Sequence, residues 1–139
     1  MRTITVLIVD RDLGFVFWLG QLLTKSGYQT LPAKSCESAS ELADRLNLPI
    51  DILIVGNSLT SASVLAEALC RSNRHLKVIA VLDDGEAAVS AFSGADATQY
   101  RPSRLDEGSK TEWLKTIEGV LTRAAEGPRV VPSSGAKPS

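Results

Sequence analysis

The chain has few of the residues that most often form metal or redox centres. Its 139 residues include one histidine, His75, and two cysteines, Cys36 and Cys70. Neither cysteine has a second cysteine or a histidine at the spacing of a zinc site, so that class of site is not indicated. His75 lies in a polar stretch and is expected in a solvated loop. We expect both cysteines to be buried free thiols.

The chain also lacks a long hydrophobic run and an excess of charge of either sign. Fifteen Lys and Arg residues nearly cancel 16 Asp and Glu residues, which gives no general attraction to nucleic acid or acidic lipid. No apolar run approaches the roughly 18 residues of a membrane span. The apolar N-terminal stretch ends at Asp10 instead of a small-residue cleavage site, unlike a signal peptide. We expect a cytoplasmic protein with no nucleic-acid or membrane partner.

Short apolar runs alternate along the chain with longer amphipathic segments. The runs predict strands over residues 3–9, 28–33, 50–55, 76–82 and 97–100, and the amphipathic segments predict helices over 13–25, 35–46, 60–70, 86–92 and 111–125. Uninterrupted apolar runs are typical of strands buried on both faces of a parallel sheet. The alternation predicts an α/β fold, with a flavodoxin-like, doubly wound five-stranded parallel sheet and five helices. Pro32 should place the second strand near an edge.

The hydrophobic residues, 44% of the chain, suffice for one domain, which we place at residues 1–125. Residues 126–139 form a Pro/Gly/Ser-rich tail that cannot bury enough apolar surface to offset its chain entropy. We expect this tail to be disordered. It could be part of a linker to an output domain.

Four short motifs lie in or next to the predicted strands, and such sheets bind ligands at the carboxyl ends of their strands. They are Val6-Leu7-Ile8-Val9-Asp10, Asp51-Ile52-Leu53-Ile54-Val55, Gly94-Ala95-Asp96 and Arg101-Pro102. In their order and spacing the chain resembles the receiver domain of two-component response regulators, over about residues 3–122. The resemblance implies the receiver fold and a place in phosphorelay signal transduction, as a signalling module and not an enzyme.

The resemblance also locates the family's phosphorylation pocket, and most positions depart from it. The two adjacent acids that hold Mg²⁺ fall on Asp10 and Arg11, the phospho-accepting Asp on Gly56, the hydroxyl residue after the fourth strand on Leu82, the Lys on Arg101 and the rotating aromatic on Thr98. Glycine supplies no nucleophile for phosphotransfer. Asp10, with Asp12 as a weak second candidate, is a poor start for Mg²⁺, which usually takes one or two carboxylates. The sequence thus predicts a degenerate receiver, or pseudo-receiver, without a cofactor.

The arginines that replace these residues suggest how the pocket is filled. We expect Arg11 or Arg101 to pair with Asp10 or Asp83, because an arginine beside a carboxylate turns repulsion into attraction. In the alternative, Asp10 or Asp12 only caps the first helix and Arg11 points into water.

A phosphorylation-independent receiver would act through protein–protein contacts. Val16 and Phe17 lie beside the apolar face of the first predicted helix and are candidate contact residues. In the receiver family this helix contacts a helical phosphodonor domain, so a histidine kinase, a phosphotransfer domain or a downstream effector is the expected partner, and a homodimer is a further expectation. Two alternatives stay open. One is a small-molecule sensor that uses the vacated pocket, and the other is a phosphoacceptor that uses a different acid, Asp12 or Asp83.

Overall fold

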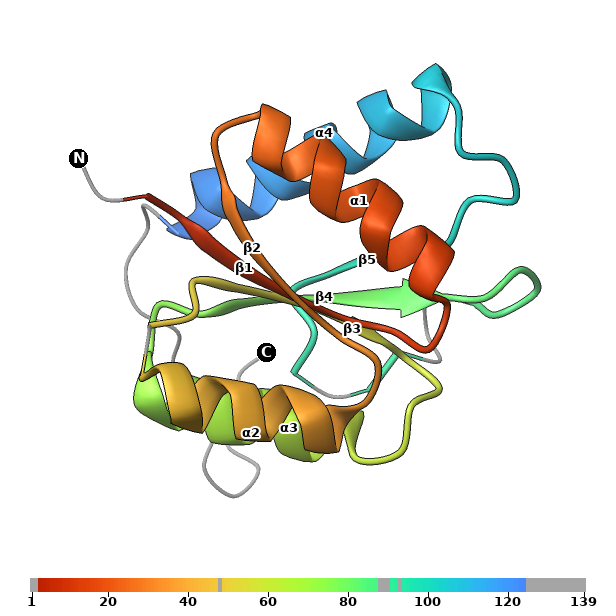
Figure 1. Ribbon diagram of the computed structural model, residues 1–139. Coiled ribbons are helices and arrows are strands. Elements are labelled where there is room, and N and C mark those ends of the chain that lie inside the picture. The colour runs from red at the N-terminus through yellow and green to blue at the C-terminus, as the bar shows by residue number, and fades with distance from the viewer. Residues whose placement is uncertain (1–2, 48, 88–90, 93, 125–139) are drawn as a thin grey trace.

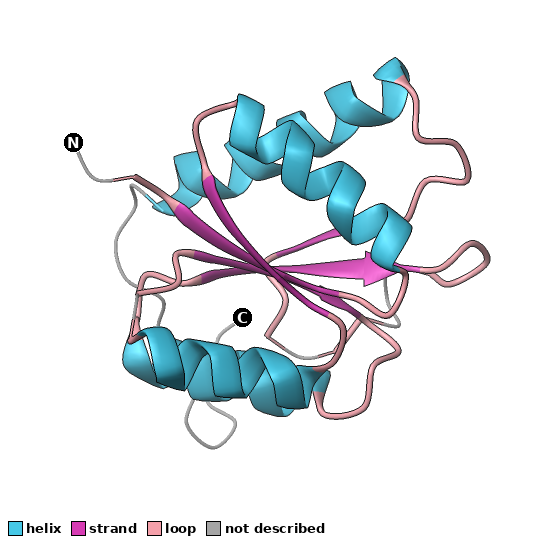
Figure 2. Cartoon of the chain, viewed as in Figure 1, coloured by secondary structure: helices cyan, strands magenta, loops and turns pink. Residues whose placement is uncertain are grey.

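The computed structural model describes residues 3–47, 49–87, 91–92 and 94–124. Its elements in chain order are β1 (Thr5–Val9), α1 (Leu13–Lys25), β2 (Gln29–Ala33), α2 (Cys36–Leu46), β3 (Ile52–Gly56), α3 (Ala62–Ser72), β4 (Lys77–Leu82), β5 (Ala97–Tyr100) and α4 (Glu107–Ala124). The five strands form one parallel sheet in the order β2-β1-β3-β4-β5. Helices α1 and α4 cover one face of the sheet, and α2 and α3 cover the other (Figures 1 and 2).

This architecture confirms the predicted α/β class and the doubly wound five-stranded parallel sheet. Strand β2, which contains Pro32, lies at one edge, as its missing amide hydrogen predicted. The last helix begins at Glu107, earlier than the predicted start at Thr111. The predicted tail, 126–139, lies outside the described residues.

The predicted helix over residues 86–92 is wrong for the part of it that the structure describes. Residues 86–87 and 91–92 are not helical, and residues 88–90 lie outside the description. Tertiary hydrogen bonds hold this segment instead. The Glu86 carboxylate accepts from the side-chain amide of Asn57, and the backbone amide of Phe92 donates to the side-chain oxygen of Asn57. The described residues therefore contain four helices instead of five.

The core lies on both faces of the sheet because successive strand side chains point to opposite sides. In β1, Val6 and Ile8 pack with Phe15 and Trp113 beneath α1 and α4. Leu7 and Val9 pack with the residues of α2 and α3. Every residue of β1, β3 and β4 is buried, which explains their uninterrupted apolar sequence.

Both cysteines lie in the core as free thiols, as predicted. Burial raises the pKa of the Cys36 thiol, so the reactive thiolate is disfavoured there. His75 is exposed.

Two carboxylates fix the start of neighbouring strands. Asp51 Oδ2 accepts a hydrogen bond of 2.8 Å from the amide of Thr5, and Asp96 Oδ2 accepts one of 2.7 Å from the amide of Val78. Asp96 belongs to the Gly-Ala-Asp motif. Its role here is to hold β5 against β4 at the end of the sheet away from the candidate pocket.

Helix α1 contains a glycine that its packing does not demand. A Cβ at Gly20 would lie 3.7 Å from Thr30 Oγ1, which is an ordinary contact distance. Gly27, just past the helix, has a φ of 98°, a left-handed conformation that side chains disfavour.

We predict opposite effects for alanine at these two glycines. Gly20→Ala should raise the free energy of unfolding by about 0.5–1 kcal/mol, because alanine is the better helix former. Gly27→Ala should lower it by about 1 kcal/mol through backbone strain. Urea denaturation of the three proteins measures both changes, and a Gly20→Ala protein less stable than the parent would contradict the geometry at that site.

Candidate functional site: a closed pocket at the strand ends

The carboxyl ends of β1, β3, β4 and β5 bring the predicted pocket residues to one edge of the sheet. Asp10 follows β1, Gly56 ends β3, Leu82 ends β4 and Arg101 follows β5. The backbone amide of Arg101 donates to the carbonyl of Leu82 at 2.9 Å, which fixes the base of the arginine beside β4. The parallel order of the strands therefore assembles these positions from distant parts of the chain.

The guanidinium of Arg101 faces three carboxylates. Its Nη2 lies 2.7 Å from Asp10 Oδ2, its Nη1 pairs with the carboxylate of Asp83, and its Nε lies 3.9 Å from Asp12 Oδ2. The guanidinium carbon also lies 5.9 Å from the centre of the Phe15 ring, in a cation–π position. Because the arginine side chain is only 18% exposed, water screens its contact with Asp10 weakly.

Asp10 is fully buried and cannot remain charged there without partners. One oxygen, Oδ2, meets Arg101. The other, Oδ1, accepts a hydrogen bond of 2.9 Å from the amide of Asp12. A buried carboxylate that is both paired and hydrogen-bonded is stable only while each partner stays in place. Asp10 therefore ties the loop after β1 to the loop after β5.

The space beside Gly56 is already occupied. A Cβ built at this glycine would lie 3.2 Å from Asp10 Oδ2 and 3.2 Å from Leu59 Cγ, closer than most real contacts of a Cβ. The half-buried Leu59 packs with the hydrophobic cluster under α2 and α3. Leu82 is fully buried and apolar. A side chain at position 56 would therefore require Asp10 and Leu59 to shift.

The residues present do not fit Mg²⁺. Position 56 offers no ligand, Arg11 is exposed, and the guanidinium of Arg101 already holds the oxygen of Asp10 that faces Gly56. Within the described ranges, no three His, Cys, Asp or Glu side chains are grouped to hold a metal ion. Mg²⁺ requires several oxygen ligands, and here the guanidinium of Arg101 competes with it for the carboxylate of Asp10.

A second polar cluster, which the sequence did not reveal, joins the loops after β3, β4 and β5. Asn57 Nδ2 donates to Glu86 Oε2 at 3.1 Å, and Glu86 Oε1 accepts from the amide of Asp83 at 2.6 Å. The Tyr100 hydroxyl donates to the backbone carbonyl of Glu86 at 2.7 Å. Nothing in the local sequence of Asn57 indicated a partner 29 positions later.

Both hypotheses about the charged residues are confirmed in part. Arg101 pairs with Asp10 and Asp83, as one of them expected. Asp12 caps α1 by accepting from the amide of Phe15 at 3.2 Å, and Arg11 is exposed, as the other expected.

The two candidate contact residues on α1 differ in exposure. Phe17 is 59% exposed, whereas Val16 is 1% exposed and belongs to the core. Val16 faces inward because it packs against the sheet, so only Phe17 offers surface to a partner. Leu13, one helical turn before Phe17, is also exposed.

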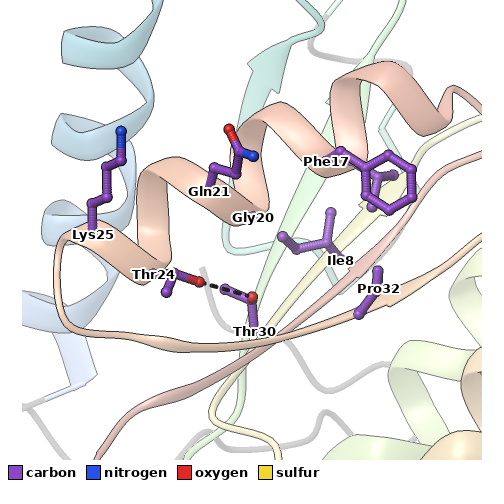
Figure 3. A pocket seen from close by; sticks show the side chains of 9 residues that line it. Ile8, Phe17, Gly20, Gln21, Thr24, Lys25, Thr30 and Pro32 are labelled. Carbon is purple, nitrogen blue, oxygen red and sulfur yellow. Dashed lines mark hydrogen bonds between the residues drawn. The ribbon is translucent and has the colours of Figure 1, made fainter.

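Several hollows among the described residues lie outside the Asp10–Arg101 cluster. One of about 490 Å³ lies between α1 and β2 (Figure 3), and others lie beside α2 and α3 and beside α4. None of these hollows is lined by Asp10, Gly56, Leu82 or Arg101. A ligand that bound between Asp10 and Gly56 would have to displace Arg101 or Leu59.

Arg101→Gln should lower the free energy of unfolding by roughly 3 kcal/mol, because it leaves the buried charge of Asp10 without its counter-ion. Arg104→Gln, a loss of the same charge at an exposed position, should change it by less than about 0.5 kcal/mol. Chemical denaturation measures both. Equal stability of the two variants would show that the Arg101 contacts contribute little.

Comparison with known proteins gives a structural match without a close sequence match. No protein-family model matches the sequence, and a search of curated proteins returns no match. Among solved structures, the chain is similar to a CheY-like response regulator receiver domain protein from Methanospirillum hungatei, with a TM-score of 0.70 and 23% identity over 90% of this chain and 98% of that one. A receiver domain protein from Clostridium thermocellum has a TM-score of 0.69 and 16% identity, over 88% and 98% of the chains. A response regulator from Thermotoga maritima has a TM-score of 0.68 and 20% identity, over 87% of this chain and 99% of that one.

At these identities the similarity establishes the fold. In the described part of the chain, no helix is both long and apolar enough to cross a membrane. The five-stranded parallel sheet with its strand order and covering helices is the fold of response regulator receiver domains.

Proposed function

We propose that this protein is a receiver-type module of two-component signal transduction that acts by protein–protein contact without accepting phosphate. The observation that carries the proposal is the Arg101 cluster, in which one guanidinium meets Asp10, Asp83 and Asp12 beside a glycine whose surroundings are tightly packed. Phosphotransfer to a receiver needs a carboxylate nucleophile, and position 56 has none. On this view the protein is not an enzyme and needs no cofactor.

The other acids at this edge are poor substitutes for the missing nucleophile. Asp12 caps α1 and lies near Arg101, and Asp83 pairs with Arg101 directly. Phosphorylation of either would add negative charge beside the remaining carboxylates and break a contact that balances a buried charge. These contacts favour a structural role for both acids.

A fixed arrangement of the strand ends fits constant activity better than switching. Arg101 joins the loops after β1 and β4, and Asn57 with Glu86 joins the loops after β3 and β4. A phosphorylation switch needs a second state that phosphate stabilises. Here the guanidinium of Arg101 already binds the carboxylates that a metal ion would need, and those carboxylates already hold the cation that a phosphoryl group would need.

The exposed face of α1 is the surface we assign to the partner. Leu13 and Phe17 lie one turn apart and are 42% and 59% exposed, and Arg11 and Lys25 are exposed near the two ends of the helix. The α1 sequence contains no acidic residue. A helical domain with an apolar stripe flanked by acids, as in a histidine kinase or phosphotransfer domain, would be complementary to this face. A downstream effector or a second copy of the chain are the other candidates.

The loss of phosphorylation is tested by intact mass. Incubation with acetyl phosphate and Mg²⁺ should leave the mass of the protein unchanged, because the nucleophile is missing. A receiver domain with its acceptor Asp serves as the positive control in the same buffer. A gain of one phosphate that disappears in Asp12→Asn or Asp83→Asn would overturn the proposal.

The partner surface is tested by comparing two exposed apolar residues. After capture and identification of a partner, Phe17→Ala should weaken its binding by about tenfold through loss of an aromatic anchor. Val64→Ala on α3, across the sheet, removes a side chain that is 61% exposed and should leave the affinity unchanged. Adding acetyl phosphate should not alter either affinity. Equal binding by both variants would move the interface away from α1.

A further inference from the structure

We propose that the hollow between α1 and the edge strand β2 is a binding site for a small amphipathic anion, with an apolar body and one anionic head group. The hollow measures about 490 Å³, a typical size for a small-molecule site. Its lining residues are Ile8, Val16, Phe17, Gly20, Gln21, Thr24, Lys25, Thr30 and Pro32. This site is separate from the closed pocket at the strand ends.

The lining of the hollow changes from apolar to polar along α1. Figure 3 shows Phe17, Ile8 and Pro32 together at one end and Lys25 at the other. Thr24 on α1 and Thr30 on β2 face each other nearer the Lys25 end. From Phe17 to Lys25 the helix rises about 12 Å. A ligand with an aliphatic or aromatic body of that length would place its head group at Lys25. The Lys25 side chain extends away from β2 in Figure 3, so its ammonium would have to turn toward the hollow to meet the head group.

Gly20 keeps the middle of the hollow open. An added Cβ would meet only Thr30 Oγ1, at 3.7 Å, so the packing of α1 on the sheet does not require a glycine. Glycine is also among the least favourable residues in a helix interior. Its effect here is to leave space between the apolar end and the polar end of the hollow. Next to this space the hydroxyls of Thr24 and Thr30 form a hydrogen bond of 3.3 Å.

The charge around the hollow favours an anion. Lys25 is the one charged residue among those that line it, and the sequence of α1 has no acid. A lysine in the last turn also complements the helix dipole, so its presence alone decides nothing. The edge strand is a poor site for an added strand, because the exposed Pro32 has no amide hydrogen to donate. A compact ligand therefore fits the hollow better than an extended peptide.

Such a ligand would contact Phe17, the residue that we assign to the partner surface, and would compete with the partner. This consequence rests on the proposed function. Ligand binding itself does not, because it can be measured on the isolated chain with no partner present.

The test is a titration of the isotope-labelled full chain with decanoate below its micellar concentration, followed by NMR of the backbone amides. We expect saturable shifts confined to α1 and β2. Gly20→Leu, which fills the hollow, should weaken binding at least about tenfold. Gly119→Ala, a helix-interior glycine change in α4 where an added Cβ meets nothing within 4 Å, should leave the affinity unchanged.

The head group is tested with decanol and Lys25→Gln. Decanoate should bind the parent more tightly than decanol does, and Lys25→Gln should remove that difference. Shifts that do not saturate, or that persist unchanged in Gly20→Leu, would overturn the site. Equal binding of decanoate to the parent and to Lys25→Gln would overturn the anionic class. If Gly20→Leu is unfolded by circular dichroism, Gly20→Ala replaces it, and an affinity equal to that of the parent would likewise overturn the site.

Discussion

The ion pair between Asp10 and Arg101 is the contact on which the strand ends of this protein depend. Asp10 directly follows β1, which lies between β2 and β3 in the sheet. Because Asp10 is fully buried, its charge must be balanced within the fold. Arg101 comes from the far side of the sheet, after β5, and reaches across β3 and β4 to do so. Because the same guanidinium also holds Asp83, the loops after three strands share one cation. Their positions are therefore linked through a single side chain.

This contact also explains why the glycine at the end of β3 is part of a larger arrangement. A side chain at Gly56 would meet both Asp10 and Leu59, and a carboxylate there would add a further negative charge to a cluster with one cation. The missing nucleophile, the arginine and the packed leucine are thus mutually consistent. Restoring an aspartate at position 56 alone would introduce strain and repulsion without restoring a metal site, since position 11 would still be an arginine.

The sequence predicted those parts of the structure that local patterns determine. Uninterrupted apolar runs predicted buried parallel strands, Pro32 predicted the edge, and the motif spacing placed Asp10 and Arg101 at one end of the sheet. The errors came from tertiary contacts. Residues 86–92 have the composition of a helix, but the side chain of Asn57 binds both the carboxylate of Glu86 and the backbone amide of Phe92. Val16 was predicted to be a contact residue because it lies beside the apolar face of the helix. Packing against the sheet buries it instead. No local pattern shows that Leu59 folds back over Gly56.

The closed strand ends and the open side of α1 differ in how readily a ligand or partner could reach them. An input at the strand ends would have to break the Asp10–Arg101 pair and expose a buried carboxylate, at a cost comparable to a large share of the stability of a small domain. An input at α1 needs no such change, because Phe17 is exposed and the hollow beside it is already formed. A ligand or partner can alter an equilibrium only by its differential affinity for two states. In a domain whose strand ends are held in one state, α1 and β2 are therefore where binding can most readily affect what the protein does.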